Sequence, residues 1–136
     1  MDKPEDVSYR FDMASAALWA GQAMALTETA LVHALSYDDT TGLGLSHGQA
    51  CGRWLPKVYQ LASQSSEEMG IFLRTAMQPM IADEYQLAAW VNALGCPTVS
   101  LDDHSIETER RIACALHTTR GRNFIELSPQ HALQKV

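Results

Sequence analysis

The feature that most limits the fold of this chain is residues 11–37, a segment with no proline and a single glycine, Gly21. Proline and glycine are the residues that most weaken a helix interior, so the segment is compatible with one long helix. Its apolar side chains fall on every face: Leu18, Trp19, Ala20, Ala23, Met24, Leu26, Leu31, Val32 and Leu35. Helices that are apolar all round are buried ones. We therefore predict a central, buried helix over residues 11–37.

The ratio of residue types extends the helical prediction to the whole chain. Ala and Leu supply 33 of the 136 residues, whereas Val and Ile together supply 11. Ala and Leu favour helices, and β-branched residues favour strands. The predicted fold class is all-α, a bundle of five or six helices. The expected domains are a flexible leader over residues 1–10 and a single helical domain over residues 11–136.

The remaining helices are placed by their start and stop signals. The segment 38–44 is expected to be a loop, because it is rich in Asp, Thr and Gly. A capping box from Ser65 to Glu68 and an N-cap at Ser105 are expected to begin two of the helices. The predicted helices are residues 47–62 (interrupted by Pro56), 65–77, 81–94, 105–118 and a short final helix opened by Ser128 and Pro129.

Charge and cysteine content exclude several classes of protein. Ten Lys and Arg residues among sixteen acidic ones give a net charge of -6, which disfavours binding to nucleic acid or to an anionic membrane. The uncharged run over residues 13–27 is shorter than the ~20 apolar residues of a bilayer span. The acidic first residues do not form a secretory signal. Three scattered cysteines are typical of a reduced, cytoplasmic protein.

Two histidines, His33 and His47, are the strongest candidates for chemistry. The sequence has no phosphate-binding loop, no H-E-x-x-H and no G-x-S-x-G, and residues 42–47 miss the dinucleotide fingerprint. His33 is expected late on the first helix and His47 at the next helix start, so the two imidazoles could converge on one Fe, Zn or Ni ion. The alternative is that both are structural histidines with satisfied ring nitrogens.

The other polar candidates are expected to have structural positions. Surface or capping positions are predicted for His104, His117 and His131. Turns are predicted to contain the carboxylates Asp38, Asp39, Asp102 and Asp103. Small core positions are predicted for the cysteines Cys51, Cys96 and Cys114.

The segment from His33 to Tyr37, followed after a loop by His47-Gly48-Gln49-Ala50 and Leu55-Pro56, resembles a known family. It is similar to the C-terminal helical domain of the iron-dependent (group III) alcohol dehydrogenases, in particular the branch with phosphonoacetaldehyde reductases. Further similarities are at residues 16–23, at the Gly-x-Pro turn of residues 94–98, and at Arg122-Asn123 with Leu127-Ser128. The resemblance covers nearly the whole chain.

The resemblance implies a metal-dependent oxidoreductase site. In the family, two histidines at these positions, with an Asp and a His from an earlier helix, hold a divalent metal, usually iron or zinc. The metal polarises the substrate oxygen while NAD(P) exchanges hydride. His33 and His47 would then be two of the four ligands. Tyr37 stands where many members carry another His, and it is a candidate residue on the substrate side. No catalytic or cofactor-binding residue is assigned.

The sequence departs from the family pattern in one large respect, and this defines the functional expectations. Nothing in it corresponds to the nucleotide-binding domain, and the Asp and His of the metal site would precede residue 1. We expect a truncated or split family member, inactive alone, that works with a nucleotide-binding partner subunit or as a homo-oligomer. Two histidines alone should hold a metal weakly. The alternatives are a non-catalytic helical module with vestigial histidines and an unrelated all-α protein.

Association should involve apolar surface that the missing domain would otherwise cover. Exposed apolar patches of several hundred Å² normally mark an interface. The candidates for part of such a surface are Trp19, Trp54 and Trp90, together with the apolar first helix.

Overall fold

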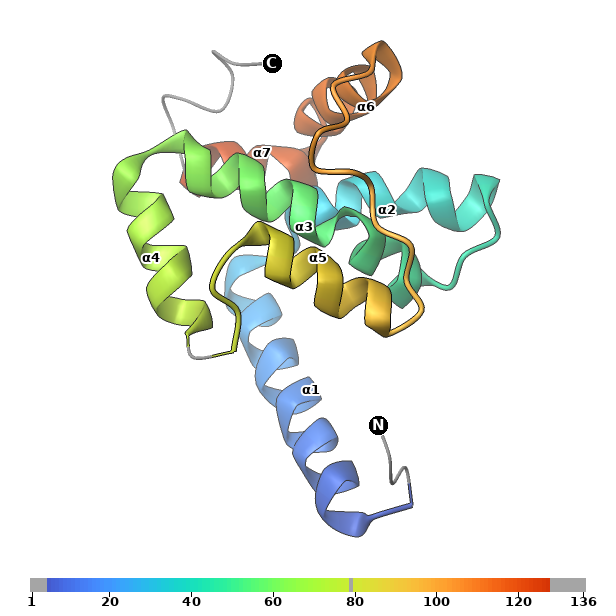
Figure 1. Ribbon diagram of the computed structural model, residues 1–136, viewed down its shortest axis with the longest axis vertical. Coiled ribbons are helices and arrows are strands. Elements are labelled where there is room, and N and C mark those ends of the chain that lie inside the picture. Colours follow the sequence, from blue (N-terminus) through green and yellow to red (C-terminus); the bar gives the residue numbers. More distant parts are fainter. Residues whose placement is uncertain (1–4, 79, 128–136) are drawn as a thin grey trace.

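The structure is a computed structural model that describes residues 5–78 and 80–127, with side chains described throughout except at residues 27 and 124–127. Within these ranges it consists of helices without strands, so the all-α prediction is confirmed. The seven helices are α1 (Val7–Thr27), α2 (Leu31–Gly42), α3 (His47–Ser65), α4 (Glu67–Met77), α5 (Glu84–Ala93), α6 (Ile106–Leu116) and α7 (Thr119–Leu127). Figure 1 shows α3 at the centre of the body, with α1 projecting away from it.

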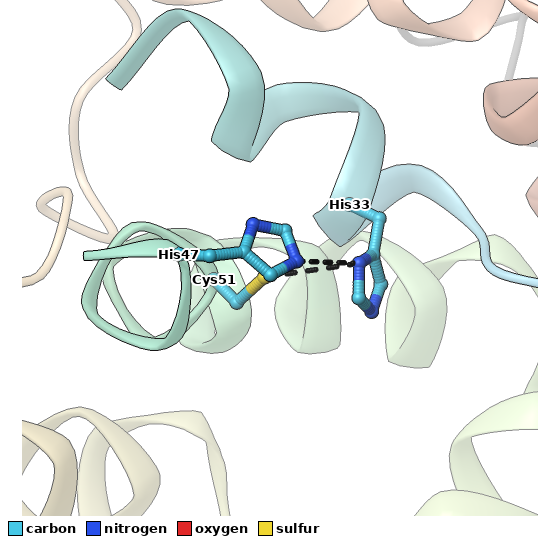
Figure 2. Close-up of side chains that lie close together, drawn as sticks. All are labelled: His33, His47 and Cys51. Atoms are coloured by element: carbon cyan, nitrogen blue, oxygen red, sulfur yellow. Dashed lines mark hydrogen bonds between the residues drawn. The ribbon is translucent and has the colours of Figure 1, made fainter. Parts of the chain in front are cut away.

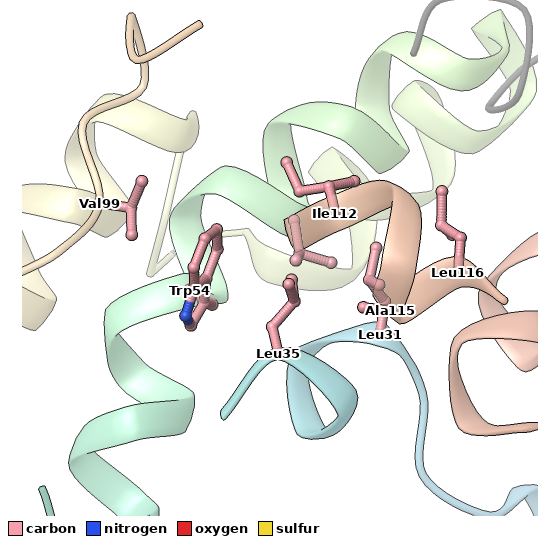
Figure 3. Packing of buried hydrophobic residues seen from close by; sticks show 8 residues of the cluster. Leu31, Leu35, Trp54, Val99, Ile112, Ala115 and Leu116 are labelled. Atoms are coloured by element: carbon pink, nitrogen blue, oxygen red, sulfur yellow. The ribbon is translucent and has the colours of Figure 1, made fainter. Parts of the chain in front are cut away.

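The main hydrophobic core joins α2, α3 and α6. Trp54 of α3 is its largest fully buried side chain, with 1% of its surface exposed. Figure 3 shows the indole packed between residues from the other elements. The core consists of Leu31, Leu35, Trp54, Val58, Val99, Ile112, Ala115 and Leu116. A second cluster of Tyr59, Ile81, Leu87 and Val91 packs α5 against α3. Both clusters use α3, so this helix is fixed from two sides.

A buried carboxylate, Asp39, connects the same three helices. One oxygen accepts a hydrogen bond from Trp54 Nε1 at 2.6 Å, and the other accepts one from Arg111 Nη2 at 2.8 Å. Arg53 Nε lies 3.3 Å from the first oxygen. The Arg111 guanidinium also stacks on the Trp54 ring, 4.6 Å from its centroid. The prediction that Asp39 is a turn residue was therefore wrong. Its partners come from α3 and α6, which local sequence does not indicate.

The first helix is exposed, which corrects the prediction of a central, buried helix. Trp19 is 72% exposed and Leu26 is 88% exposed. No described helix packs extensively against α1, and Figure 1 shows it leaving the body. All-round apolar character indicates that a helix needs partners, but it does not show that the same chain provides them. Among the tryptophans expected at an apolar surface, Trp19 and Trp90 are exposed, whereas Trp54 is buried.

The predicted continuous helix over residues 11–37 is interrupted between Thr27 and Leu31. The backbone of Glu28 has φ 62° and ψ -172°, a conformation that residues other than glycine rarely adopt. Asn123 of α7 donates from Nδ2 to the Thr29 carbonyl at 2.8 Å. The residue that helps to hold the break is thus about ninety positions away, so the absence of Gly and Pro was not sufficient to predict continuity.

Other helix boundaries differ in smaller ways. α2 continues to Gly42 through most of the predicted loop, and Thr40 and Thr41 each donate from the hydroxyl to a carbonyl one turn earlier. The N-cap of α4 is Ser66 rather than Ser65, and α5 begins at Glu84, after its N-cap Asp83, rather than at residue 81.

The predicted leader overlaps the first helix, because Asp6 accepts from Ser8 N and α1 begins at Val7. The N-cap at Ser105 is confirmed. The helix expected from Ser128 lies outside the described residues. Among the described helices, none has the length and apolar character needed to cross a membrane.

Candidate metal centre

The loop between α2 and α3 brings the two candidate histidines together. α3 begins at His47 because Ser46 forms a capping box with Gln49. Leu45 N donates to the Asp39 carbonyl, so the loop folds back along α2. His47 therefore lies beside α2 near Ser36. His33 is in the first turn of α2 rather than late on a long helix. The predicted proximity of His33 and His47 is nevertheless confirmed.

The two imidazoles face each other through one nitrogen each. His33 Nδ1 and His47 Nε2 lie 3.1 Å apart, and the ring centroids are separated by 5.1 Å. Figure 2 shows His33 on α2 pointing toward His47 on α3. Two nitrogens at ~2.1 Å from one tetrahedral metal lie about 3.4 Å apart. The donor spacing therefore fits a shared metal, and ligation by these residues remains a prediction.

Ser36 contacts the ring nitrogen of His47 that does not face His33. The Ser36 hydroxyl is buried and donates to the His33 carbonyl at 2.9 Å. Its oxygen lies 3.4 Å from His47 Nδ1. Because the hydroxyl hydrogen is used, this contact favours a proton on Nδ1 and a free lone pair on Nε2. The His47 ring is thus oriented by its other nitrogen, as is usual for metal-ligating histidines.

Cys51 is the residue at this site that the sequence prediction missed. Its Sγ lies 3.7 Å from His47 Nε2 and 4.0 Å from His33 Nδ1. Among the described residues, these three form a cluster whose ligand atoms all lie within 4.8 Å of one another. Cys51 is half-buried rather than a core residue. The signal was its spacing of four residues from His47, which places both on one helical face.

Burial and charge act on the protonation of these groups. Burial lowers the pKa of His33, and the positive charges of His47 and Arg120 lower it further. The neutral imidazole, which is the ligating form, is therefore favoured. Burial raises the pKa of the Cys51 thiol. The protonated thiol is therefore favoured when no metal ion is bound to the sulfur.

Tyr37 and Arg120 lie beside the histidines. The Tyr37 ring centroid is 6.1 Å from that of His47, and the Arg120 guanidinium lies 5.1 Å from the Tyr37 centroid. Arg120 belongs to α7 and is exposed. The substrate-side role of Tyr37 remains a prediction, but its ring does lie next to one of the candidate ligands.

The remaining candidates from the sequence lie at less informative positions. His104 and His117 are exposed, as expected, and His131 lies outside the described residues. Asp38 is exposed but lies within α2, so the turn prediction was wrong for this residue as well, and Asp102 is exposed in a turn. Asp103 accepts hydrogen bonds from Ser105 N and Thr108 Oγ1 at the start of α6. Cys96 is half-buried and packs against the Tyr59 cluster, whereas Cys114 is exposed, so the core prediction was wrong for Cys114.

The comparison with protein families decides what kind of domain carries this site. The model of the Fe-containing alcohol dehydrogenase family, C-terminal, matches residues 1–131. The chain belongs to this family. The match includes both histidines and all seven described helices, so the family resemblance seen in the sequence is confirmed.

One relative that matches part of the chain is a phosphonoacetaldehyde reductase from Streptomyces viridochromogenes. It is 45% identical over 51 residues, which is 38% of this chain and 13% of that protein. The similarity to this relative therefore spans a small part of the reductase. No solved structure matches the chain significantly.

Proposed function

We propose that this domain supplies His33 and His47 to the metal centre of an NAD(P)-dependent alcohol or aldehyde oxidoreductase. The observation that carries the proposal is the 3.1 Å approach of the two ring nitrogens in a domain of the Fe-containing alcohol dehydrogenase family. Iron and zinc both accept imidazole ligands, so either fits the donor set.

In this proposal, the present domain helps to bind the metal, and another polypeptide binds the nicotinamide cofactor. A bound divalent metal would act as a Lewis acid on the oxygen of an alcohol or aldehyde. His33 and His47 hold that ion, and Ser36 keeps the His47 ring in the ligating orientation. The nicotinamide would be held by a nucleotide-binding partner, which would also supply the remaining ligands. The domain alone is expected not to transfer hydride.

The surface proposed to bind that partner is α1. Its apolar residues are exposed along the length of the helix, including Phe11, Leu18 and Trp19. Large exposed apolar patches normally mark an interface. Either a nucleotide-binding subunit or a second copy of the chain is expected to cover α1. Trp19→Glu should then weaken association, with a second copy or with the nucleotide-binding subunit, in analytical ultracentrifugation. Equal association of the parent chain and of Trp19→Glu in both experiments would contradict the proposal.

The proposed substrate class is an aldehyde that carries an anionic group. Arg120 presents an exposed guanidinium beside Tyr37 and close enough to His33 to affect its pKa. The named relative is a reductase of phosphonoacetaldehyde. In the complemented enzyme, Arg120→Ala should raise KM for phosphonoacetaldehyde more than for an uncharged aldehyde. Arg110→Ala is the control, because Arg110 pairs with Glu107 on the exposed side of α6. Equal effects of both variants would contradict this assignment.

Zinc titration of the purified chain by calorimetry tests the metal proposal. The parent should bind one zinc ion, and His33→Ala and His47→Ala should each abolish that binding at the same concentrations. His104→Ala and His117→Ala, which change exposed histidines, should bind as the parent does. An unchanged titration in both site variants would mean that the histidines are vestigial and would favour the non-catalytic module.

A further inference from the structure

We propose that Cys51 is a third protein ligand of the same metal, so that this domain alone offers a two-histidine, one-cysteine site. The inference rests on the proposed function, since it concerns the ion held by His33 and His47. It goes further, because it changes the ligand set, the expected affinity and the metal preference of the isolated chain.

The three donor atoms have the separations that a first-row metal requires. Their distances are 3.1 Å between the nitrogens, and 3.7 and 4.0 Å from the sulfur to each nitrogen. A tetrahedral ion with Zn–N bonds of ~2.1 Å and a Zn–S bond of ~2.3 Å requires about 3.4 Å between the nitrogens and about 3.6 Å from the sulfur to each nitrogen. The side chains can therefore close on an ion with shifts of a few tenths of an ångström.

The helices α2 and α3 hold the three side chains in this arrangement. His47 and Cys51 are one turn apart on α3, so their side chains share a face, as Figure 2 shows. α3 is held by both core clusters, and Asp39 connects it to α2, the helix of His33. The other two cysteines do not belong to the cluster. The positions of the three ligands are thus set by buried parts of the fold.

Ligation by Cys51 changes the charge and the chemistry of the site. The thiol gives up its proton to solvent as the sulfur–metal bond forms, so one negative charge is added beside the divalent ion. Thiolate and imidazole together select zinc or cobalt over magnesium and manganese. Three protein ligands also leave one position of a tetrahedral ion open, which is the pattern of catalytic rather than structural zinc sites. A substrate oxygen, water or a partner's carboxylate could occupy that position.

Cobalt(II) reports thiolate ligation directly, because the sulfur gives it a near-ultraviolet charge-transfer band that imidazole does not. The parent chain loaded with cobalt should show this band. Cys51→Ser should lose it, and zinc binding should weaken by about a hundredfold, since even the loss of an outer partner of a metal ligand costs about 10–100-fold. Cys96→Ser is the matched control and should retain both the band and the affinity.

Alkylation of the parent chain tests the inference without any substitution. Zinc should protect Cys51 from a maleimide, measured by mass spectrometry of peptides, while Cys114, which is exposed, should react equally with and without zinc. Cobalt binding without the band, together with unchanged alkylation of Cys51, would overturn the cysteine assignment but leave the histidine pair intact. Loss of zinc binding in the histidine variants, with full binding retained by Cys51→Ser, would have the same meaning. No metal binding by the parent would overturn both proposals.

Discussion

The helix α1 and the body formed by α2, α3 and α6 contain the same kinds of apolar residue, but they use them in opposite ways. Trp54 is enclosed by three elements and donates its indole N–H to Asp39. Trp19 belongs to an equally apolar segment and is exposed. The difference shows that burial depends on which surfaces meet. In the body, the hydrophobic effect, a buried ion pair and a stacked arginine reinforce one another, whereas most large apolar side chains of α1 are exposed.

The sharpest test of the contrast is to truncate one tryptophan in each region. Trp54→Ala removes a fully buried indole and leaves Asp39 without one of its donors, so the free energy of unfolding should fall by about 3–5 kcal/mol. Trp19→Ala should change it by less than about 0.5 kcal/mol. Urea denaturation followed by circular dichroism measures both. Comparable losses would show that α1 packs as firmly as the body.

Neighbouring aspartates on α2 allow a second test of the body itself. Asp39→Asn breaks a buried pair whose cations remain partly accessible to water, so a loss of about 2–3 kcal/mol is expected. Asp38→Asn is the control, because Asp38 is exposed and 4.0 Å from Arg111, and it should cost less than about 1 kcal/mol. If the two variants were equally stable, the Asp39 network would not be what holds α2 to α3.

The smallest expected effect concerns the two aspartates at the starts of α6 and α1. Hydrogen bonds from Ser105 and Thr108 lower the pKa of Asp103 to about 2 from its ordinary value of 3.8. The carboxylate therefore favours the folded state above pH ~4, and this contribution is lost as the pH falls toward 2. Asp103→Asn should flatten that part of the pH dependence of unfolding.

Asp6 provides the comparison at α1. Hydrogen bonds from Ser8 lower its pKa in the same direction. Because α1 is not packed on the body, Asp6→Ala, which removes the side-chain acceptor of the N-cap, should reduce helical circular dichroism without changing the unfolding midpoint. A shift of the midpoint by Asp6→Ala as large as that by Asp103→Asn would contradict the independence of α1.

Local chemistry was sufficient to predict the parts of the fold that depend on neighbouring residues. The start of α3 at His47 and the Ser105 cap follow from side chains that satisfy free N–H groups within one turn. The break at Glu28 and the burial of Asp39 could not be predicted in this way. They depend on Asn123 and Arg111, whose positions are defined only after the chain has folded.

The candidate site was predicted in part for a related reason. His33 and His47 could be paired through the family resemblance, and their proximity is confirmed. Cys51 was classified by composition as a core residue, although its spacing from His47 places it on the same helical face. Orientation by Ser36 depends on how the loop after Gly42 folds back along α2, and the sequence does not indicate that path.

The most direct test of the central claim is a zinc titration of the ¹⁵N-labelled chain, followed through the ring nitrogens of its histidines by NMR. With one equivalent of zinc, the signals of His33 Nδ1 and His47 Nε2 should shift to the range of metal-bound nitrogen. His104 and His117 should remain unchanged, because both are exposed and outside the cluster. Zinc-dependent shifts at His104 or His117, with the His33 and His47 signals unaltered, would contradict the assignment of the metal centre to the start of α2 and α3.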